Sequence, residues 1–403
     1  ADLMVRGGVA ERVSLEHARV ARAIFAEAVL RGLSLRDAGF DTLAFHDCSL
    51  DRPVFAGLRA SVFAAASSEL VEATWGGSQI DDLALVGSVL TDCDLRGAAF
   101  ARPVIARAVV RGGNWEGVAL RDAVLRELDV AETSLRDVSF GGADLTDSSW
   151  LGCDLTGADL AGTDLTGADL AGCTAPEVTF RGARTVGLSL AGTDLRNANL
   201  ARTRFAGVDF SEANFEGAQT RDAVFVEANF SKARLAGVSF EGCDCDAANF
   251  TEADATGANF AGASLREVTF SGATARGASF EGARFEKSWL DGCDLSEARF
   301  GAATLSYCDL QGSTLTGTEL RGADLTGSDL SGIDLCVARV DRSTVLTSVQ
   351  LTRARLAGMN LAGCQMTDVD IAEADAAGTC FDQAEMSRCI ATKAALVGAT
   401  FLK

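Results

Sequence analysis

Residues 153–172 read CDLTG-ADLAG-TDLTG-ADLAG, which is a run of four five-residue units. Each unit contains a small residue, an aspartate, a leucine, a variable residue and a glycine. Outward from this stretch, Leu or Phe occupies most positions at every fifth residue from Val5 to Val345, and only Thr185 and Thr220 among these positions are polar. Such a regular period predicts one structural unit that is built many times over.

A five-residue period fits neither an α-helix nor a flat strand. In a helix each repeat would advance about 140° around the axis, so the leucines would spiral over every face. In a flat strand an odd period would send successive large residues to opposite sides. The period does fit a chain that turns a corner once per repeat: the small and large residues point inward, the residue between them points outward, and the last two form the corner. Four corners would close a square coil of about 20 residues, and successive coils would pair as parallel strands.

Units of the forms Ala-Asp-Leu and Ala-Asn-Phe recur through the middle of the chain. Examples are Ala198–Leu200, Ala213–Phe215, Ala228–Phe230, Ala248–Phe250 and Ala258–Phe260. These units resemble the pentapeptide-repeat family, and the resemblance covers essentially the whole chain. It implies an all-β fold, a right-handed quadrilateral parallel β-helix, for which the number of repeats predicts about 20 coils.

We expect residues 1–403 to form a single domain, because no linker interrupts the repeats. A register slip of one residue near 341–350 fits a bulge at a corner. Residues one coil apart should stack, which predicts two internal ladders of aromatic rings. One ladder comprises Phe240, Phe260, Phe280 and Phe300, and the other comprises Phe210, Phe230, Phe250 and Phe270.

The chain is strongly acidic, with a formal net charge of −20. A surface of this kind repels nucleic acid and anionic membranes, so we predict no direct nucleic-acid binding. No stretch is long and apolar enough to predict a membrane span. Acidity also keeps a long repeat protein soluble, and this interpretation competes with a functional one. Since no secretory signal is evident, we predict a cytoplasmic location.

The residues that usually carry chemistry do not converge in this pattern. His17 and His46 fall at corner or outward positions in different coils, without the partners that catalysis or a metal ion would need. Most of the 12 cysteines occupy the small inward position, where they act as apolar fillers with free thiols. We therefore predict no catalytic residue, no metal site and no cofactor, and we do not expect an enzyme.

The outward slot contains a candidate binding surface, which we call the acidic column. Its carboxylates fall at multiples of one coil on the same face, with interruptions by threonines and by Arg234. The acidic column consists of Asp94, Asp154, Asp194, Asp254, Asp294 and Asp334. Trp289 in the outward slot and Tyr307 at a corner are candidate exposed contact residues, whereas the other three tryptophans occupy the large inward position.

Two functions agree with these features. The first is a non-catalytic protein-interaction scaffold, or a rod-like repeat domain of a larger, secretion-associated bacterial protein. The second rests on the resemblance, since some family members resemble B-form DNA in size, shape and charge and bind DNA gyrase in its place. It implies a DNA-mimicking binder of DNA gyrase or topoisomerase IV that gives resistance to topoisomerase poisons. The interruptions of the acidic column favour the scaffold. Because the repeats run almost to both ends, we expect end-to-end pairing with another copy, or removal of neighbouring sequence.

Overall fold

The computed structural model describes residues 2–402 and shows an all-β chain of parallel coils, about 19 turns in total. This confirms the predicted parallel β-helix. The chain divides into two compact units, one ending at Arg204 and one beginning at Phe205. The 3-10 turn η1 (Leu335–Val337) is the only helical segment among the described residues. The expectation of a single domain stays a prediction.

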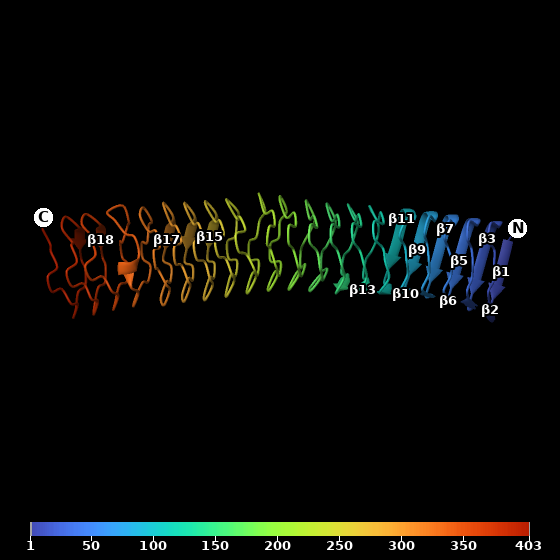
Figure 1. Cartoon of the computed structure of the whole chain (residues 1–403), viewed down its shortest axis with the longest axis horizontal. Coiled ribbons are helices and arrows are strands. Elements are labelled where there is room, and N and C mark those ends of the chain that lie inside the picture. Colours follow the sequence, from blue (N-terminus) through green and yellow to red (C-terminus); the bar gives the residue numbers. More distant parts are fainter. Residues whose placement is uncertain (1, 403) are drawn as a thin grey trace. The chain divides into compact units, whose positions relative to one another are not determined.

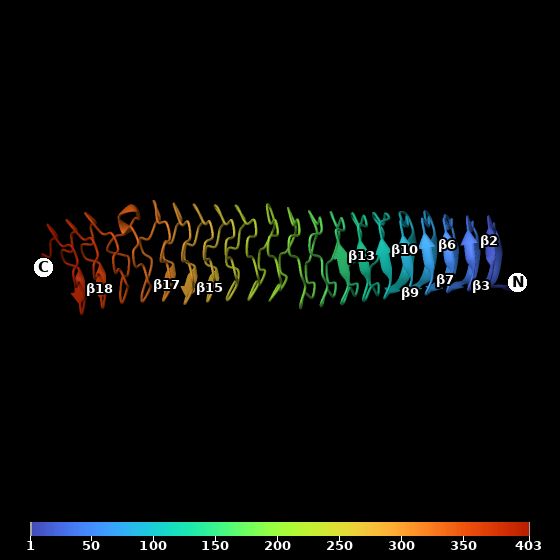
Figure 2. The same ribbon diagram turned by 90° about the horizontal axis from the view of Figure 1, so that it is seen from below.

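Two parallel sheets run along the first unit. The six-stranded sheet consists of β1 (Asp2–Arg6), β3 (Arg19–Ala26), β5 (Gly39–His46), β7 (Arg59–Ala66), β9 (Gln79–Val86) and β11 (Ala99–Ala106). The eight-stranded sheet consists of β2 (Val9–Glu11), β4 (Val29–Arg31), β6 (Ser49–Asp51), β8 (Glu69–Val71), β10 (Val89–Thr91), β12 (Val109–Arg111), β13 (Asp129–Ala131) and β14 (Ser149–Leu151). Figure 1 shows the first sheet side by side near the N-terminus, and Figure 2 shows strands of the second.

Adjacent strands in these sheets lie one coil apart in sequence, as the repeat predicts. In the first unit Asp2 pairs with Arg22, and Val9 pairs with Val29. The second unit has shorter sheets and many single bridges, such as Asn229 with Asn249. Its strands are β15 (Ser264–Arg266), β16 (Arg284–Glu286), β17 (Thr304–Ser306), β18 (Gln365–Thr367) and β19 (Glu385–Ser387).

Most corners are turns whose second corner residue has a left-handed backbone. At one corner the N–H of Ala158 donates to the carbonyl of Leu155 at 2.9 Å, and Gly157 between them has a φ of 69°. Glycine adopts this conformation without strain. Glu177 also adopts it, with a φ of 61°, and an L-residue in this region costs roughly 1–2 kcal/mol. The stacked coils therefore hold many non-glycine residues in a disfavoured conformation.

One corner of the first unit has no turn. Strands β3, β5, β7, β9 and β11 each run straight through it for eight residues. In the ladder between β3 and β5, Val20 pairs with Phe40 and Arg22 pairs with Thr42, so Ala21 and Asp41 both drop out of the pairing and the register does not change. The residues at the second corner position of these coils lie in extended strand: Arg22, Thr42, Val62, Asp82 and Arg102. None of them is glycine, and the β-branched ones disfavour the left-handed region.

The core contains both predicted aromatic ladders, and their rings stack. Neighbouring ring centroids in the first ladder are 4.9, 5.2 and 4.8 Å apart, along Phe240, Phe260, Phe280 and Phe300. The corresponding distances in the second are 5.2, 5.0 and 4.5 Å, along Phe210, Phe230, Phe250 and Phe270. All eight rings are fully buried in the second unit. The inward placement of the large residues is thereby confirmed.

The structure places the extra residue of the register slip within residues 341–343. Before this point bridge partners are 20 residues apart, as in Glu319 with Arg339. Asp324 instead bridges Val345, which is 21 residues away. The buried Thr344 hydroxyl donates to the Leu320 carbonyl at 2.9 Å. Val345 therefore lies in the outward slot, whereas the sequence period had predicted it inside. The inward position belongs to Leu346, which is fully buried.

Candidate interaction surfaces

The outward aspartates and asparagines close the corners that follow them. One carboxylate oxygen of Asp154 accepts a hydrogen bond from the backbone N–H of Thr156 at 3.0 Å, and the amide oxygen of Asn199 accepts one from Ala201 at 3.1 Å. This side-chain turn recurs along the chain and satisfies a backbone donor that the ladder does not use. The frequent Asp or Asn in the outward slot thus has a structural role before any functional one.

Arginines neutralise most of the acidic column. Five of its six carboxylates accept an arginine side chain, with nitrogen–oxygen distances of 2.7 Å for Asp94–Arg96, 3.1 Å for Asp154–Arg136, 2.7 Å for Asp194–Arg196, 2.8 Å for Asp294–Arg276 and 3.1 Å for Asp334–Arg355. The hydrogen bond from Arg96 holds the pKa of Asp94 below its ordinary value, and Arg196 has the same effect on the pKa of Asp194. Asp254 makes no ion pair with any residue between 2 and 402. The acidic column is therefore a ladder of paired charges more than a line of free carboxylates.

The two candidate aromatic residues are exposed in the second unit. Trp289 is 48% exposed and follows β16, while Tyr307 is 62% exposed and follows β17 directly. The Tyr307 ring lies over Gly327, where a Cβ would overlap it. Trp75, Trp115 and Trp150 are each 1% exposed, so their predicted inward placement is confirmed.

Free carboxylates lie next to Trp289 in its own outward column. Trp289 bridges Asp309, and Asp309 bridges Asp329. In the part of the chain that the structure describes, neither aspartate has an arginine or lysine partner. Their hydrogen bonds come from the backbone N–H groups of Gln311 and Ser331 and from the Gln311 amide. The sequence prediction did not include this column, because the acidic column was chosen on the face of Asp294. The positions 20 and 40 residues after Trp289 are Asp309 and Asp329, so the same spacing rule would have identified them.

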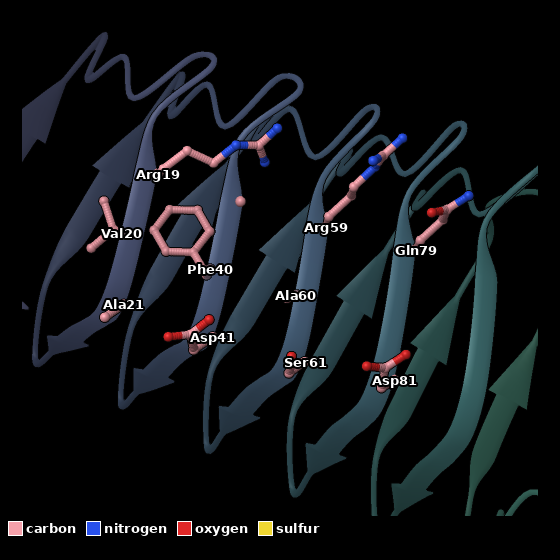
Figure 3. A pocket seen from close by; sticks show the side chains of 11 residues that line it. Arg19, Val20, Ala21, Phe40, Asp41, Arg59, Ala60, Ser61, Gln79 and Asp81 are labelled. Carbon is pink, nitrogen blue, oxygen red and sulfur yellow. The ribbon is translucent and has the colours of Figure 1, made fainter.

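A groove of about 530 Å³ lies over the straight corner of the first unit (Figure 3). Figure 3 shows that side chains from consecutive strands line two banks: Arg19, Arg59 and Gln79 on one, and Asp41, Ser61 and Asp81 on the other. Gly39 leaves room for the Arg19 side chain, which would overlap a Cβ at that position. The repeat pattern gives only a negative signal for this groove, which is the lack of a glycine at the second corner position of five successive coils, so it was not predicted from the sequence.

Most of the cysteine side chains are buried in the core. All 12 cysteines are free, and nine of them are buried. Burial raises the pKa of the Cys93 thiol to about 12 and that of Cys293 to about 12, which suppresses the thiolate form. His17 lies at a corner, 3.9 Å from Asp37. Across residues 2–402, no three His, Cys, Asp or Glu side chains are grouped as a metal ion would require. No described helix is long and apolar enough to cross a membrane.

Comparisons with known proteins agree with this fold. A family model described as pentapeptide repeats matches in eight copies, and the matched ranges include 139–174, 177–211, 203–242, 243–282, 278–317, 293–332 and 350–388. No protein in the curated set matches the sequence.

Three solved structures illustrate the similarity. HetL, a pentapeptide repeat protein involved in heterocyst differentiation regulation in the cyanobacterium Nostoc, is 22% identical; the match covers 60% of this chain and 90% of HetL, with a TM-score of 0.23. QnrB1, a plasmid-mediated fluoroquinolone resistance protein, is 20% identical over 66% of this chain and 92% of its own, with a TM-score of 0.23. AlyGC, a PL6 family alginate lyase, is 8% identical over 100% of this chain and 97% of its own, with a TM-score of 0.23. The family-model matches span more than half of the sequence, and the chain belongs to the pentapeptide-repeat family.

Proposed function

We propose that the chain is a non-catalytic scaffold that binds another protein through the outward faces of its coils. The observation that carries this proposal is the exposure of Trp289 and Tyr307 on the second unit, in a fold that buries its other tryptophans. Covering an exposed aromatic ring is favourable, and tyrosine and tryptophan are enriched where proteins meet. Twelve free thiols suit a reducing compartment, so we place the scaffold in the cytoplasm.

The test compares the proteins that bind the immobilised native chain with those that bind a variant without the two exposed rings, which we call the face variant. Trp289→Thr with Tyr307→Ser removes both rings; the same columns already contain Thr269 and Ser348, so the fold should tolerate the changes. Asp294→Asn on another face serves as the matched control. In lysate of the source cell, we expect at least one protein that both the native chain and the control retain and the face variant loses. Identical sets of retained proteins for all three would contradict the proposal.

A second candidate function is the binding of DNA gyrase or topoisomerase IV in place of DNA. It is favoured by the column of Trp289, in which the aspartates of the second unit have no basic partner among the described residues: Asp209, Asp309, Asp329 and Asp370. The arginine partners of the acidic column count against it. Purified chain should inhibit gyrase supercoiling, or protect it from a quinolone, at micromolar concentration. The absence of both effects would rule out this candidate.

A further inference from the structure

We propose that the face around Trp289 binds an extended, Lys/Arg-rich segment of a partner protein, with Trp289 as the aromatic platform and its neighbouring aspartates as the anionic partners. This inference rests on the proposed scaffold function and names the chemistry of its partner. We call this surface the tryptophan face; it comprises Trp289, Asp291, Tyr307, Asp309 and Asp329.

The tryptophan face places free carboxylates beside the ring at regular spacing. Trp289, Asp309 and Asp329 occupy one outward column through successive parallel bridges, so each lies about 4.8 Å from the next along the stack. Asp291 lies two residues after Trp289 and accepts a hydrogen bond from the Ser271 hydroxyl at 2.5 Å. Each of these carboxylates is held by uncharged donors and, over the described chain, by no arginine or lysine. No basic side chain among the described residues therefore competes with a cationic partner for them.

A cationic partner fits this surface better than a neutral one. A Lys or Arg head group over the face of tryptophan gains cation–π energy, and tryptophan is the best of the aromatic residues for this contact. Alternate side chains of an extended basic chain lie about 6.6 Å apart, against about 4.8 Å between successive coils, and the long, flexible stems of lysine and arginine can take up this difference over two neighbouring aspartates. The same chain finds no such free charges near Asp294, because Arg276 already occupies that carboxylate.

A column of glycines runs along one flank of the tryptophan face. Gly292, Gly312 and Gly332 form consecutive corners after Trp289, Asp309 and Asp329, with φ values of 64°, 72° and 73°. A Cβ at Gly292 or Gly312 would meet only the backbone of the glycine one coil below. This glycine shoulder lets the main chain of a partner approach closely. Lys287, two residues before Trp289, is the one basic residue beside the ring on its own strand segment, and it opposes a cationic ligand.

Trp289 itself provides the measurement. The other tryptophans are buried, so long-wavelength emission and acrylamide quenching report mainly on Trp289. The probes are octa-arginine and octa-lysine, with octa-glutamate as the control peptide. We expect the basic peptides to protect Trp289 from acrylamide, with a dissociation constant that rises as salt increases from about 50 to 300 mM. Octa-glutamate should have no effect.

Four variants separate the tryptophan face from general negative charge. By calorimetry, Trp289→Thr should weaken octa-arginine binding about fivefold, the factor for roughly 1 kcal/mol of an exposed cation–π contact. Asp309→Asn with Asp329→Asn should weaken it about three- to tenfold. Asn229 and Asn249 occupy the same column, so these variants should fold. Lys287→Glu should tighten binding, and Glu267 shows that its corner accepts glutamate. Asp294→Asn, with one charge removed elsewhere, should change binding less than twofold.

Two results would overturn the proposal. One is unchanged octa-arginine affinity in Trp289→Thr. The other is an equal loss per removed charge in Asp294→Asn and in the double variant Asp309→Asn with Asp329→Asn, which would mean that only net charge attracts the peptide. Either result leaves the scaffold open, because lysate capture that depends on Trp289 would then identify a partner of other chemistry. If lysate capture did not depend on Trp289, while octa-arginine binding did, the proposed scaffold function would be contradicted and the peptide-binding proposal would stand.

Discussion

The rings of Phe240 and Phe260 stack with their centroids 4.9 Å apart and their planes 4° from parallel. They lie one coil apart, so one ring covers the face of the next and no water reaches either. This contact repeats along two ladders of the second unit, and it makes the inward phenylalanines the main packing element there.

Truncation of one of these rings should leave a cavity that the flanking coils cannot close. We expect Phe260→Ala to lower the free energy of unfolding by about 3–5 kcal/mol in urea denaturation monitored by circular dichroism. Phe260→Leu is the control, since leucine occupies the same inward position at Leu160, and it should cost less. A loss below about 1 kcal/mol for the alanine variant would contradict tight packing around the ring.

Acid should weaken the folded chain through the paired aspartates. The Arg196 hydrogen bond lowers the pKa of Asp194 from its ordinary value of 3.8, so this pair stabilises the fold above pH 3.8 and the contribution disappears as pH falls through the lowered pKa. Asp194→Asn keeps an oxygen for the corner but removes the charge. We expect native and variant stabilities to differ at pH 7 and to converge near pH 2 in urea titrations. A difference that is the same at both pH values would show that the ion pair contributes nothing.

Thiol reactivity should divide the cysteines into two groups. Nine are buried, and burial raises the pKa of thiols such as Cys173 to about 12. With an aromatic disulfide reagent at pH 8, we expect prompt reaction of at most the three half-buried thiols, Cys336, Cys380 and Cys389. All 12 should react in denaturant. Rapid reaction of more than three in the native chain would mean that the coils open readily.

Gly113 should be the least replaceable glycine of the first unit. It has a φ of 88°, and a Cβ there would clash with the carbonyl oxygen of Cys93 and lie 2.8 Å from its nitrogen. We expect Gly113→Ala to destabilise the fold by about 2–4 kcal/mol, from backbone strain and overpacking together. Gly172→Ala is the matched control because its corner is open, with nothing within 4 Å of the added Cβ. Thermal unfolding of the two variants side by side checks this, and equal losses would refute the clash.

The five-residue period by itself determined which side chains are inside. Side chains alternate along an extended segment and each corner restarts the alternation, so a position in the repeat specifies its direction. For this reason the sequence alone placed Phe240 and Phe260 in one ladder, Trp150 in the core and Trp289 outside. The same reasoning failed at Val345, because an inserted residue can be absorbed at several places in a loop and only the ladder beyond it shows which one.

The tertiary structure alone decided which of the outward charges are free. Arg276 reaches Asp294 from the corner of the preceding coil, whereas Asp309 has no such neighbour among the described residues. Long arginine side chains cross between coils, so charge pairing depends on the contents of adjacent corners and on side-chain rotamers, which a single repeat does not contain. The straight corner at Val62 likewise depends on stacking, because each strand is held extended by the strands above and below it.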